Sequence, residues 1–263
     1  MKKSKNKQKR YRNIMQRTSN WPQYMIKKVT GFGSSFTFKL KGFEPITVQK
    51  NMLGTFRENF FDDIYLQGFP DHVMAGMKAP TIIDIGANVG FFSLAAFFKF
   101  PNAIVYAFEP HPWCYNQLQQ YQKKHNSLGW RTYQQAVSNE NTTLHLTTST
   151  VDGFATMTSV NESATNVSSF SAKAIKLDEF LEANNIENID LIKLDCEGSE
   201  YPIIYSWPAA LFQKINHLCI ETHLATEENH NTKALNSYLK QAGYQTNMLD
   251  EGATGYIWAW KNQ

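Results

Sequence analysis

The sequence predicts an α/β fold built on a parallel sheet, because strand-like and helix-like segments alternate after Pro80. TIIDIG, NAIVYAFEP and RTYQQAVS have the length and apolar content of strands. VGFFSLAAFFKF and PWCYNQLQQYQKKH lie between them and have the length and apolar face of helices. Strand, helix and strand in succession are typical of βαβ units, whose strands run parallel.

The same alternation resumes nearer the C-terminus. AIKL, IDLIKLD and HLCIETH read as strands, while DEFLEANN and NTKALNSYLKQAGY read as helices. The aromatic segment GYIWAWK closes the chain as a further strand. With 263 residues and 42% apolar content, the chain can bury one large core with a small accessory region.

The remaining segments divide the chain into regions. We expect a basic, disordered tail over 1–12, an N-terminal extension or cap over 13–78, and the main domain over 79–263. Helical segments broken at Trp21–Pro22 and an alternating hairpin over 35–49 are expected in the extension. A Ser- and Thr-rich insertion over 147–171 is long for a connection, so it is either a functional lid or a disordered insertion.

Charge is concentrated at the N-terminus, where seven Lys and Arg side chains fall within the first twelve residues. The rest of the chain has 19 basic and 23 acidic side chains, a net charge of −4. Such a tail is either a solvated end or a contact for an anionic surface or nucleic acid. We favour the solvated end, because no aromatic residue among the first ten could stack on bases.

Cysteine usage and hydropathy indicate the cellular context. The three cysteines, Cys114, Cys196 and Cys219, are widely spaced and fit neither a disulfide framework nor a CxxC metal site. Reduced thiols are typical of a cytoplasmic protein. No apolar run is long enough to span a bilayer, and no apolar core follows the basic start as in a signal peptide. We therefore expect a cytoplasmic protein without a membrane span.

A glycine-containing turn, DIGANVG, follows the first strand of the main domain, and an acidic residue ends the second strand. Glycine lets the backbone approach a ligand, and the following helix N-terminus favours an electron-rich group. An acid at the end of the second strand accepts hydrogen bonds from ribose hydroxyls in doubly wound folds. A dinucleotide site needs G-x-G-x-x-G, whose middle glycine is missing here, so an NAD-linked oxidoreductase is disfavoured. The pattern predicts a nucleoside site formed by Asp84, Gly86, Ala87, Asn88, Gly90 and Glu109.

Four segments together resemble the signatures of the FkbM-type methyltransferases: TIIDIGANVGFFSL, VYAFEPHPWCYNQL, QQAVSN and LIKLDCEGSEYPII. The resemblance runs from about Ile82 to His223, with 147–171 divergent, and its most specific mark is K-x-D-x-E-G over 193–198. It implies a Rossmann-like class I fold with a seven-stranded, mostly parallel sheet of order 3-2-1-4-5-7-6. It also implies S-adenosylmethionine as the cofactor and methyl transfer to a hydroxyl of a sugar or polyketide-like molecule.

Asp195 and Glu197 follow the fourth strand, at the edge where ligands bind in open α/β sheets. A carboxylate there offsets the cationic methionine end of the cofactor, and a second one accepts the proton of an attacking hydroxyl. We expect Asp195 to contact cofactor and substrate, and Glu197 to be the base, a substrate ligand or a cap for backbone amides. His223 ends the fifth strand and is either a base or a hydrogen-bonded rim histidine.

Ala136 and Val137 end the third strand and are expected to line an apolar adenine pocket. We expect no metal, because Asp195, Glu197, Glu221 and His223 have no recognised ligand spacing. The expected partner is a small-molecule or glycan acceptor, without nucleic acid. Two alternatives stay open: an RNA methyltransferase that uses the basic tail, and a catalytically silent nucleoside-binding module.

Overall fold

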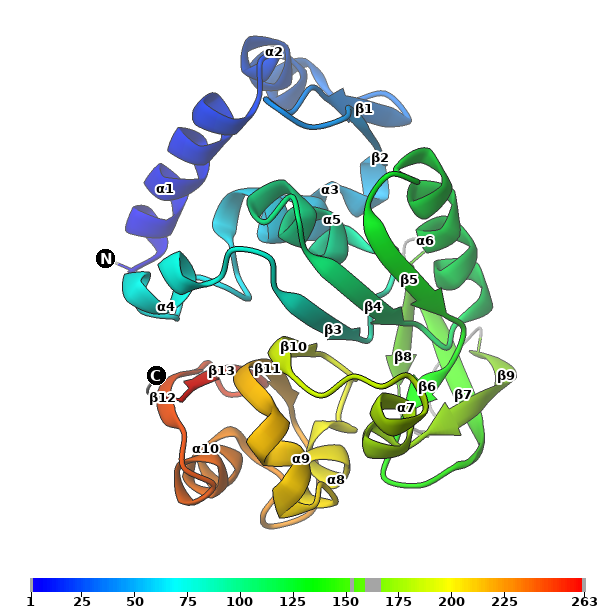
Figure 1. Ribbon diagram of the computed structural model, residues 1–263. Coiled ribbons are helices and arrows are strands. Elements are labelled where there is room, and N and C mark those ends of the chain that lie inside the picture. The colour runs from blue at the N-terminus through cyan, green and yellow to red at the C-terminus, as the bar shows by residue number, and fades with distance from the viewer. Residues whose placement is uncertain (1, 152–153, 159–166, 262–263) are drawn as a thin grey trace.

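A seven-stranded sheet forms the centre of the computed structural model, which describes residues 2–151, 154–158 and 167–261 (Figure 1). Its spatial order is β5–β4–β3–β10–β11–β13–β12, and β13 alone runs antiparallel to its neighbours. This confirms the predicted order 3-2-1-4-5-7-6 with an antiparallel last hairpin. The strands are β3 (Thr81–Ile85), β4 (Ile104–Phe108), β5 (Gly129–Tyr133), β10 (Ile189–Leu194), β11 (Ile215–His223), β12 (Gln245–Asp250) and β13 (Thr254–Trp260).

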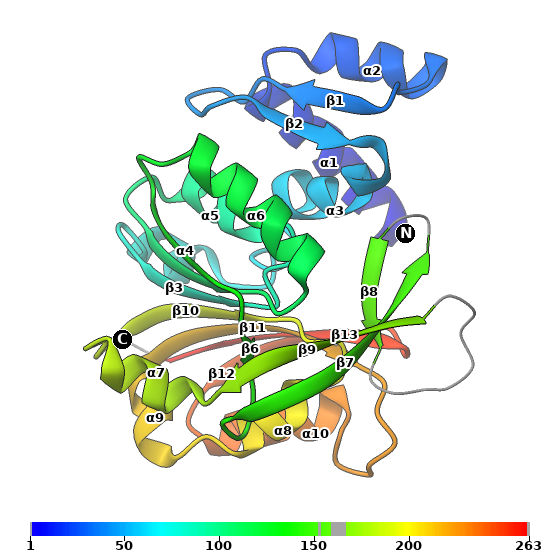
Figure 2. The same ribbon diagram turned by 90° about the vertical axis from the view of Figure 1, so that its right-hand side faces the viewer.

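Helices cover both faces of the sheet (Figures 1 and 2). One face carries α5 (Phe91–Lys99) and α6 (Pro112–Lys124). The other carries α7 (Leu177–Ala183), α8 (Glu200–Tyr205), α9 (Ala209–Lys214) and α10 (Thr232–Gln241). Neighbouring strand residues such as Ile82 and Ile83 therefore belong to two separate apolar clusters, one on each face.

The N-terminal elements pack beside α5 on the first face (Figure 2). The ring centroids of Phe56 and Phe91 lie 5.3 Å apart, and Phe36, Phe38, Phe60 and Phe61 are buried in the same cluster. These aromatic side chains therefore form core. The elements are α1 (Lys2–Arg17), α2 (Trp21–Thr30), β1 (Ser35–Phe38), β2 (Ile46–Gln49), η1 (Lys50–Met52), α3 (Leu53–Arg57), η2 (Glu58–Asp62) and α4 (Asp71–Gly76).

The basic N-terminus differs from the expected disordered tail, because residues 2–17 form helix α1. Two arginines on this helix form ion pairs with Asp62, the last residue of η2, and with Asp63, which follows it. Arg10 lies 2.5 Å from Asp62, and Arg17 lies 2.7 Å from Asp63. Composition alone does not reveal these partners, which are about fifty residues away. Within the described residues, no helix is both long and apolar enough to cross a bilayer.

The Ser- and Thr-rich insertion contributes to a second, four-stranded sheet of order β6–β9–β7–β8. Its strands are β6 (Ala136–Val137), β7 (Thr142–Val151), β8 (Phe154–Thr158) and β9 (Val167–Ile175). The described part of 147–171 is thus strand, while 152–153 and 159–166 lie outside the described residues. The predicted third strand RTYQQAVS divides after Tyr133, so that Ala136 and Val137 pair with β9 instead.

Candidate active site

A crevice opens at the carboxyl edge of the main sheet, where β3, β4 and β10 end side by side. Its lining includes Ile85 at the end of β3, Phe108 at the end of β4 and Asp195 directly after β10. Ligands of open α/β sheets bind at this edge, where the connections leave toward opposite faces. The edge was predicted, and the structure places an open crevice there.

The turn after β3 fits tightly between β4 and β10. Gly86 has φ +73°, and a Cβ on it would lie 1.9 Å from the backbone oxygen of Asp195. The amides of Gly86 and Ala87 both donate to the carbonyl of Phe108, at 3.0 and 2.9 Å. Glycine is therefore required at 86 by the neighbouring backbone as well as by the left-handed conformation. This contact adds to the sequence expectation, which considered only the approach of a ligand.

Glu109 follows β4 and lines the crevice, as its position in the sequence predicts. Its two carboxylate oxygens accept hydrogen bonds from the backbone N–H groups of Asn88 at 2.7 Å and His111 at 2.8 Å. Each oxygen keeps a second acceptor position for a ligand hydroxyl. Burial raises the pKa of Glu109 to about 7, although the two backbone donors oppose the shift.

An apolar wall lies next to Glu109. Ala136 and Val137 line the crevice together with Phe108 and, from β7, Leu144 and Leu146. This surface suits a flat aromatic ring such as adenine. The side-chain oxygen of Asn88 is buried without a hydrogen-bond partner in the described part of the chain, so it offers an acceptor to a bound group. These features fit an S-adenosyl nucleoside.

Three of the residues expected at the cofactor lie behind the crevice wall. Asp84 is fully buried, accepts a hydrogen bond from Ser93 Oγ at 2.6 Å and lies 3.4 Å from Lys193 Nζ. Ala87 is buried, and a Cβ on Gly90 would lie 2.8 Å from the Trp130 ring. Residues on this turn alternate between the crevice and the core, which the motif alone does not distinguish.

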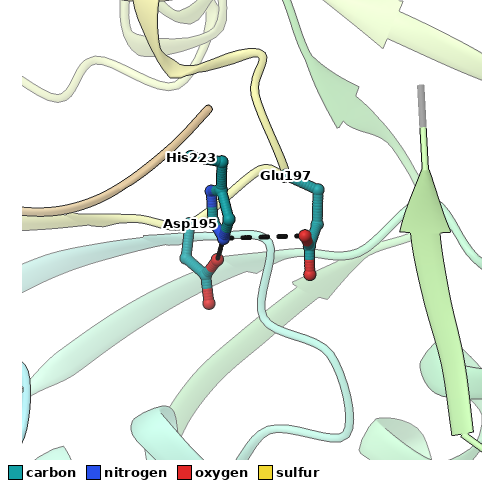
Figure 3. Close-up of side chains that lie close together, drawn as sticks. All are labelled: Asp195, Glu197 and His223. Carbon is teal, nitrogen blue, oxygen red and sulfur yellow. Dashed lines mark ion pairs between the residues drawn. The ribbon is translucent and has the colours of Figure 1, made fainter. Parts of the chain in front are cut away.

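Asp195, Glu197 and His223 converge beside the crevice (Figure 3). Asp195 and Glu197 lie in the loop after β10, and His223 ends β11. The Nε2 atom of His223 lies 3.9 Å from Asp195 Oδ1 and 3.5 Å from Glu197 Oε2. Asp195 and Glu197 also line the crevice, whereas His223 does not. The predicted catalytic trio is therefore brought together in space.

Glu200 organises the loop that carries this trio. Its carboxylate is fully buried and accepts the backbone N–H groups of Cys196 at 2.7 Å and Gly198 at 2.9 Å. Glu200, and not Glu197, thus satisfies the amides of this turn. Glu197 has φ +51°, a side chain that is 42% exposed, and a pKa raised by burial against the lowering charge of His223. Its carboxylate is therefore available to a substrate.

His223 is surrounded by carboxylates. Its Nδ1 atom lies 3.0 Å from Glu200 Oε1, and its Nε2 atom faces Asp195 and Glu197. Burial lowers the pKa of His223, but the hydrogen bond and charge of Glu200, with the other two acids, outweigh it and raise the pKa to about 9. At neutral pH this side chain is an imidazolium, which cannot act as a base until it loses its proton.

A second group of side chains adjoins Asp195 and was missed by the sequence analysis. Tyr65 Oη lies 2.7 Å from Asp195 Oδ2 and 2.8 Å from Glu221 Oε2, and Tyr256 Oη donates to Glu221 Oε1 at 2.8 Å. The strand alternation that places Glu221 and His223 on one face is a signal for Glu221, but no local pattern marks either tyrosine.

Asp195, Glu197 and His223 are also ligand types that bind divalent cations, and one ligand atom from each lies within 4.8 Å of the others. A cation there must compete with the proton on His223. The trio could hold a metal, but neither its burial nor its partners require one.

A crevice with these features, at the carboxyl edge of a sheet of this order, fits the Rossmann-like class of methyltransferases that use S-adenosylmethionine. The methyltransferase FkbM domain model matches residues 84–246, so the chain belongs to the FkbM methyltransferase family. The matched range includes the crevice turn, Glu109 and the acid trio. It ends before Tyr256 and begins after Tyr65.

Two curated relatives that align with this chain are both named as methyltransferases. "Methyltransferase 1" of Beauveria bassiana is 27% identical over 63% of this chain and 71% of its own length. The "31-O-demethyl-FK506 methyltransferase FkbM" of Streptomyces tacrolimicus is 26% identical over 64% of this chain and 73% of its own length. The crystal structure of FkbM from Methylobacillus flagellatus KT covers 80% of this chain and 54% of its own chain, at 12% identity and a TM-score of 0.48.

Proposed function

We propose that the protein transfers a methyl group from S-adenosylmethionine to a hydroxyl of a small hydroxylated metabolite, such as a carbohydrate. The observation that carries the proposal is the position of Asp195 and Glu197. Both line the crevice that fits the cofactor, and both face the imidazole of His223. Carboxylates at this position can orient a cationic donor and take a proton from an acceptor.

The proposed cofactor contacts run along the crevice. Glu109 accepts the ribose hydroxyls, Ala136 and Val137 contact the adenine, and the turn at Gly86 and Asn88 supports the nucleoside. Asp195 faces the methionine end. When bound, S-adenosylmethionine supplies an electrophilic methyl group attached to a cationic sulfur.

Glu197 is the proposed base. Its carboxylate is the most exposed of the trio and accepts no hydrogen bond from the described residues, so an acceptor hydroxyl can reach it. Burial and the nearby acids Asp195 and Glu200 raise the pKa of Glu197, despite the opposing charge of His223, and thereby increase its basicity. His223, as an imidazolium held by Glu200, keeps the two carboxylates close together by balancing their charge.

Transfer to oxygen is supported by the Streptomyces tacrolimicus relative, whose name specifies a 31-O position. The ion pairs of helix α1 favour a small acceptor over RNA, because they occupy two of its positive charges. Arg10 and Arg17 pair with Asp62 and Asp63 of the same chain, which leaves less charge for a phosphate backbone. An RNA methyltransferase would bind RNA with an affinity that falls steeply with salt.

Calorimetry with S-adenosylmethionine, followed by a screen of alcohols and glycans for release of S-adenosylhomocysteine, tests the proposal. We expect binding of the donor and turnover with at least one hydroxylated acceptor. Binding without turnover on any acceptor would favour the silent nucleoside-binding module. Turnover confined to RNA or to amine acceptors would contradict transfer to a small-molecule hydroxyl.

A further inference from the structure

Tyr65 makes two short contacts with carboxylates but has only one proton to donate. Its Oη atom lies 2.7 Å from Asp195 Oδ2 and 2.8 Å from Glu221 Oε2. Burial, with the charges of both acids, raises the pKa of Tyr65 well above its ordinary value, so the phenol keeps its proton. If both carboxylates were ionised, one of these contacts would join two oxygens without a hydrogen between them. The geometry therefore requires one further proton in the group.

That proton belongs to Glu221 rather than to Asp195. Lys193 Nζ lies 3.6 Å from Asp195 Oδ2, and the imidazole of His223 lies on the other side of the same carboxylate. Asp195 therefore has a positively charged side chain on each side. Among the described residues, Glu221 has no ion-pair partner, and its other oxygen already accepts the Tyr256 hydroxyl. Burial and the charge of Asp195 raise the pKa of Glu221 to about 7, although both tyrosine hydrogen bonds and His223 oppose the shift.

We propose that Glu221 is protonated and donates to Tyr65, which donates in turn to Asp195, so that Tyr65 and Glu221 are positioning residues for the carboxylate that faces the cofactor. The chain of hydrogen bonds runs in one direction, from Tyr256 and Glu221 through Tyr65 to Asp195. It fixes the orientation of Asp195 and keeps a single negative charge on the pair. The role assigned to Asp195 depends on the proposed function, whereas the protonation of Glu221 does not.

Side chains of β13, α5 and β10 hold Tyr65 firmly enough for this role. Trp258 Nε1 donates to the backbone oxygen of Tyr65 at 3.0 Å, and the indole ring lies so close to Gly68 that a Cβ there would be 2.0 Å away. The Tyr65 ring contacts Phe92 and lies 5.3 Å below Lys193 Nζ. Tyr65 and Tyr256 both fall outside residues 84–246, so parts of the chain beyond the family domain complete the active site.

The protonation is tested by ¹³C NMR on the full-length protein labelled at the glutamate carboxyl carbon. Comparison with Glu221→Gln assigns the Glu221 resonance and separates it from Glu109. We expect it to titrate near neutral pH, two or more units above an ordinary glutamate. A midpoint near the ordinary value would overturn the proposal. This measurement needs no acceptor, so it stays decisive even if the proposed methyl transfer fails.

The positioning role is tested by turnover of three variants. Glu221→Gln resembles the protonated acid, so its kcat should lack the decline above neutral pH that Glu221 ionisation causes in the wild type. Tyr65→Phe should lower kcat about tenfold or more, the effect of one hydrogen bond to a charged group, with S-adenosylmethionine affinity little changed. Tyr256→Phe, which leaves the Tyr65 contact intact, should have a smaller effect. A decline above neutral pH that persists in Glu221→Gln, or unchanged kcat in Tyr65→Phe, would overturn the positioning role.

Discussion

The two sides of the active site are built in different ways. The cofactor side consists mainly of backbone, because the turn at 86–90 and the amides of Asn88 and His111 surround Glu109. The acid side consists of side chains from distant elements. Tyr65 lies 130 residues from Asp195 and 156 residues from Glu221 in the sequence. Backbone geometry is encoded within a short segment, whereas the side-chain network depends on the whole fold.

This difference determines which substitutions affect which side. A change in the turn disturbs the frame shared by both sides, while a change in one carboxylate affects its own side only. The five predictions that follow use this distinction and are ordered from the largest expected effect to the smallest.

Gly86→Ala should destabilise the protein by roughly 3 kcal/mol or more, because the added Cβ would lie 1.9 Å from the Asp195 backbone oxygen at a left-handed φ. Thermal or urea unfolding measures the loss. Gly243→Ala is the matched control, since Gly243 also has positive φ but nothing lies within 4 Å of the added atom. The control should cost about 1 kcal/mol. Equal losses of unfolding free energy in both variants would mean that the close contact between Gly86 and the Asp195 backbone does not contribute to stability.

Asp195→Asn should lower turnover about 100-fold or more, because the carboxylate that faces the donor loses its charge. Calorimetry should show S-adenosylmethionine binding weakened by about tenfold at most, since the contacts of Glu109 remain. Asp178→Asn serves as the control, because Asp178 forms an exposed ion pair with Lys176 away from the crevice. Wild-type turnover in Asp195→Asn would remove Asp195 from the reaction.

Glu109→Gln should weaken S-adenosylmethionine binding about tenfold at pH 8, the effect of hydrogen bonds to a charged acceptor. Because the pKa of Glu109 is raised to about 7, wild-type affinity should also fall as pH drops below 7, and the variant should lack this change. Calorimetry at several pH values measures both. If wild type and Glu109→Gln showed the same change of affinity with pH, Glu109 would be excluded as the titrating group.

The same shift predicts a dependence of stability on pH. The folded state binds the Glu109 proton more tightly than the unfolded chain, whose ordinary pKa is 4.5. The contribution of Glu109 to stability is therefore fully present below about 4.5 and is lost as pH rises through about 7. Unfolding of wild type and Glu109→Gln at pH 5 and pH 8 checks this sign. A wild-type advantage that grows with pH would contradict it.

Arg10→Ala should have the smallest effect, a loss of about 0.5 to 1 kcal/mol that shrinks at high salt. Arg10 is 34% exposed in its ion pair with Asp62, and neither residue lines the crevice. A double-mutant cycle with Asp62→Asn isolates the interaction. Altered S-adenosylmethionine affinity in either variant would connect helix α1 to the cofactor side.

The sequence predicted the sheet order and the place of Glu109 beside the turn after β3, because both depend on local patterns. Strand periodicity, the glycine turn and the acid after β4 lie within a few residues of one another. The family mark at 193–198 located Asp195 and Glu197 in the same way. The sequence did not predict that Asp84 and Gly90 lie away from the crevice. Asp84 faces Ser93 and Gly90 faces the Trp130 ring, and both contacts depend on tertiary packing.

The acid side could be predicted only in part. His223 was placed near the carboxylates by its strand position, but its imidazolium state depends on the buried side chain of Glu200, which the sequence analysis did not single out. Tyr65 and Tyr256 have no motif, since each reaches Glu221 through tertiary packing alone. Likewise, the helix at the basic N-terminus depends on acids about fifty residues away.

The bond from the Trp258 indole to the Tyr65 backbone joins strand β13, near the C-terminus, to the N-terminal region. A second bond, from Asn247 Nδ2 to the Gly68 backbone oxygen, joins the same two flanks, which together hold the Tyr65 phenol against Asp195. A change in either flank would therefore shift this phenol. A substitution in the last strand would then alter chemistry at an oxygen atom that it never touches.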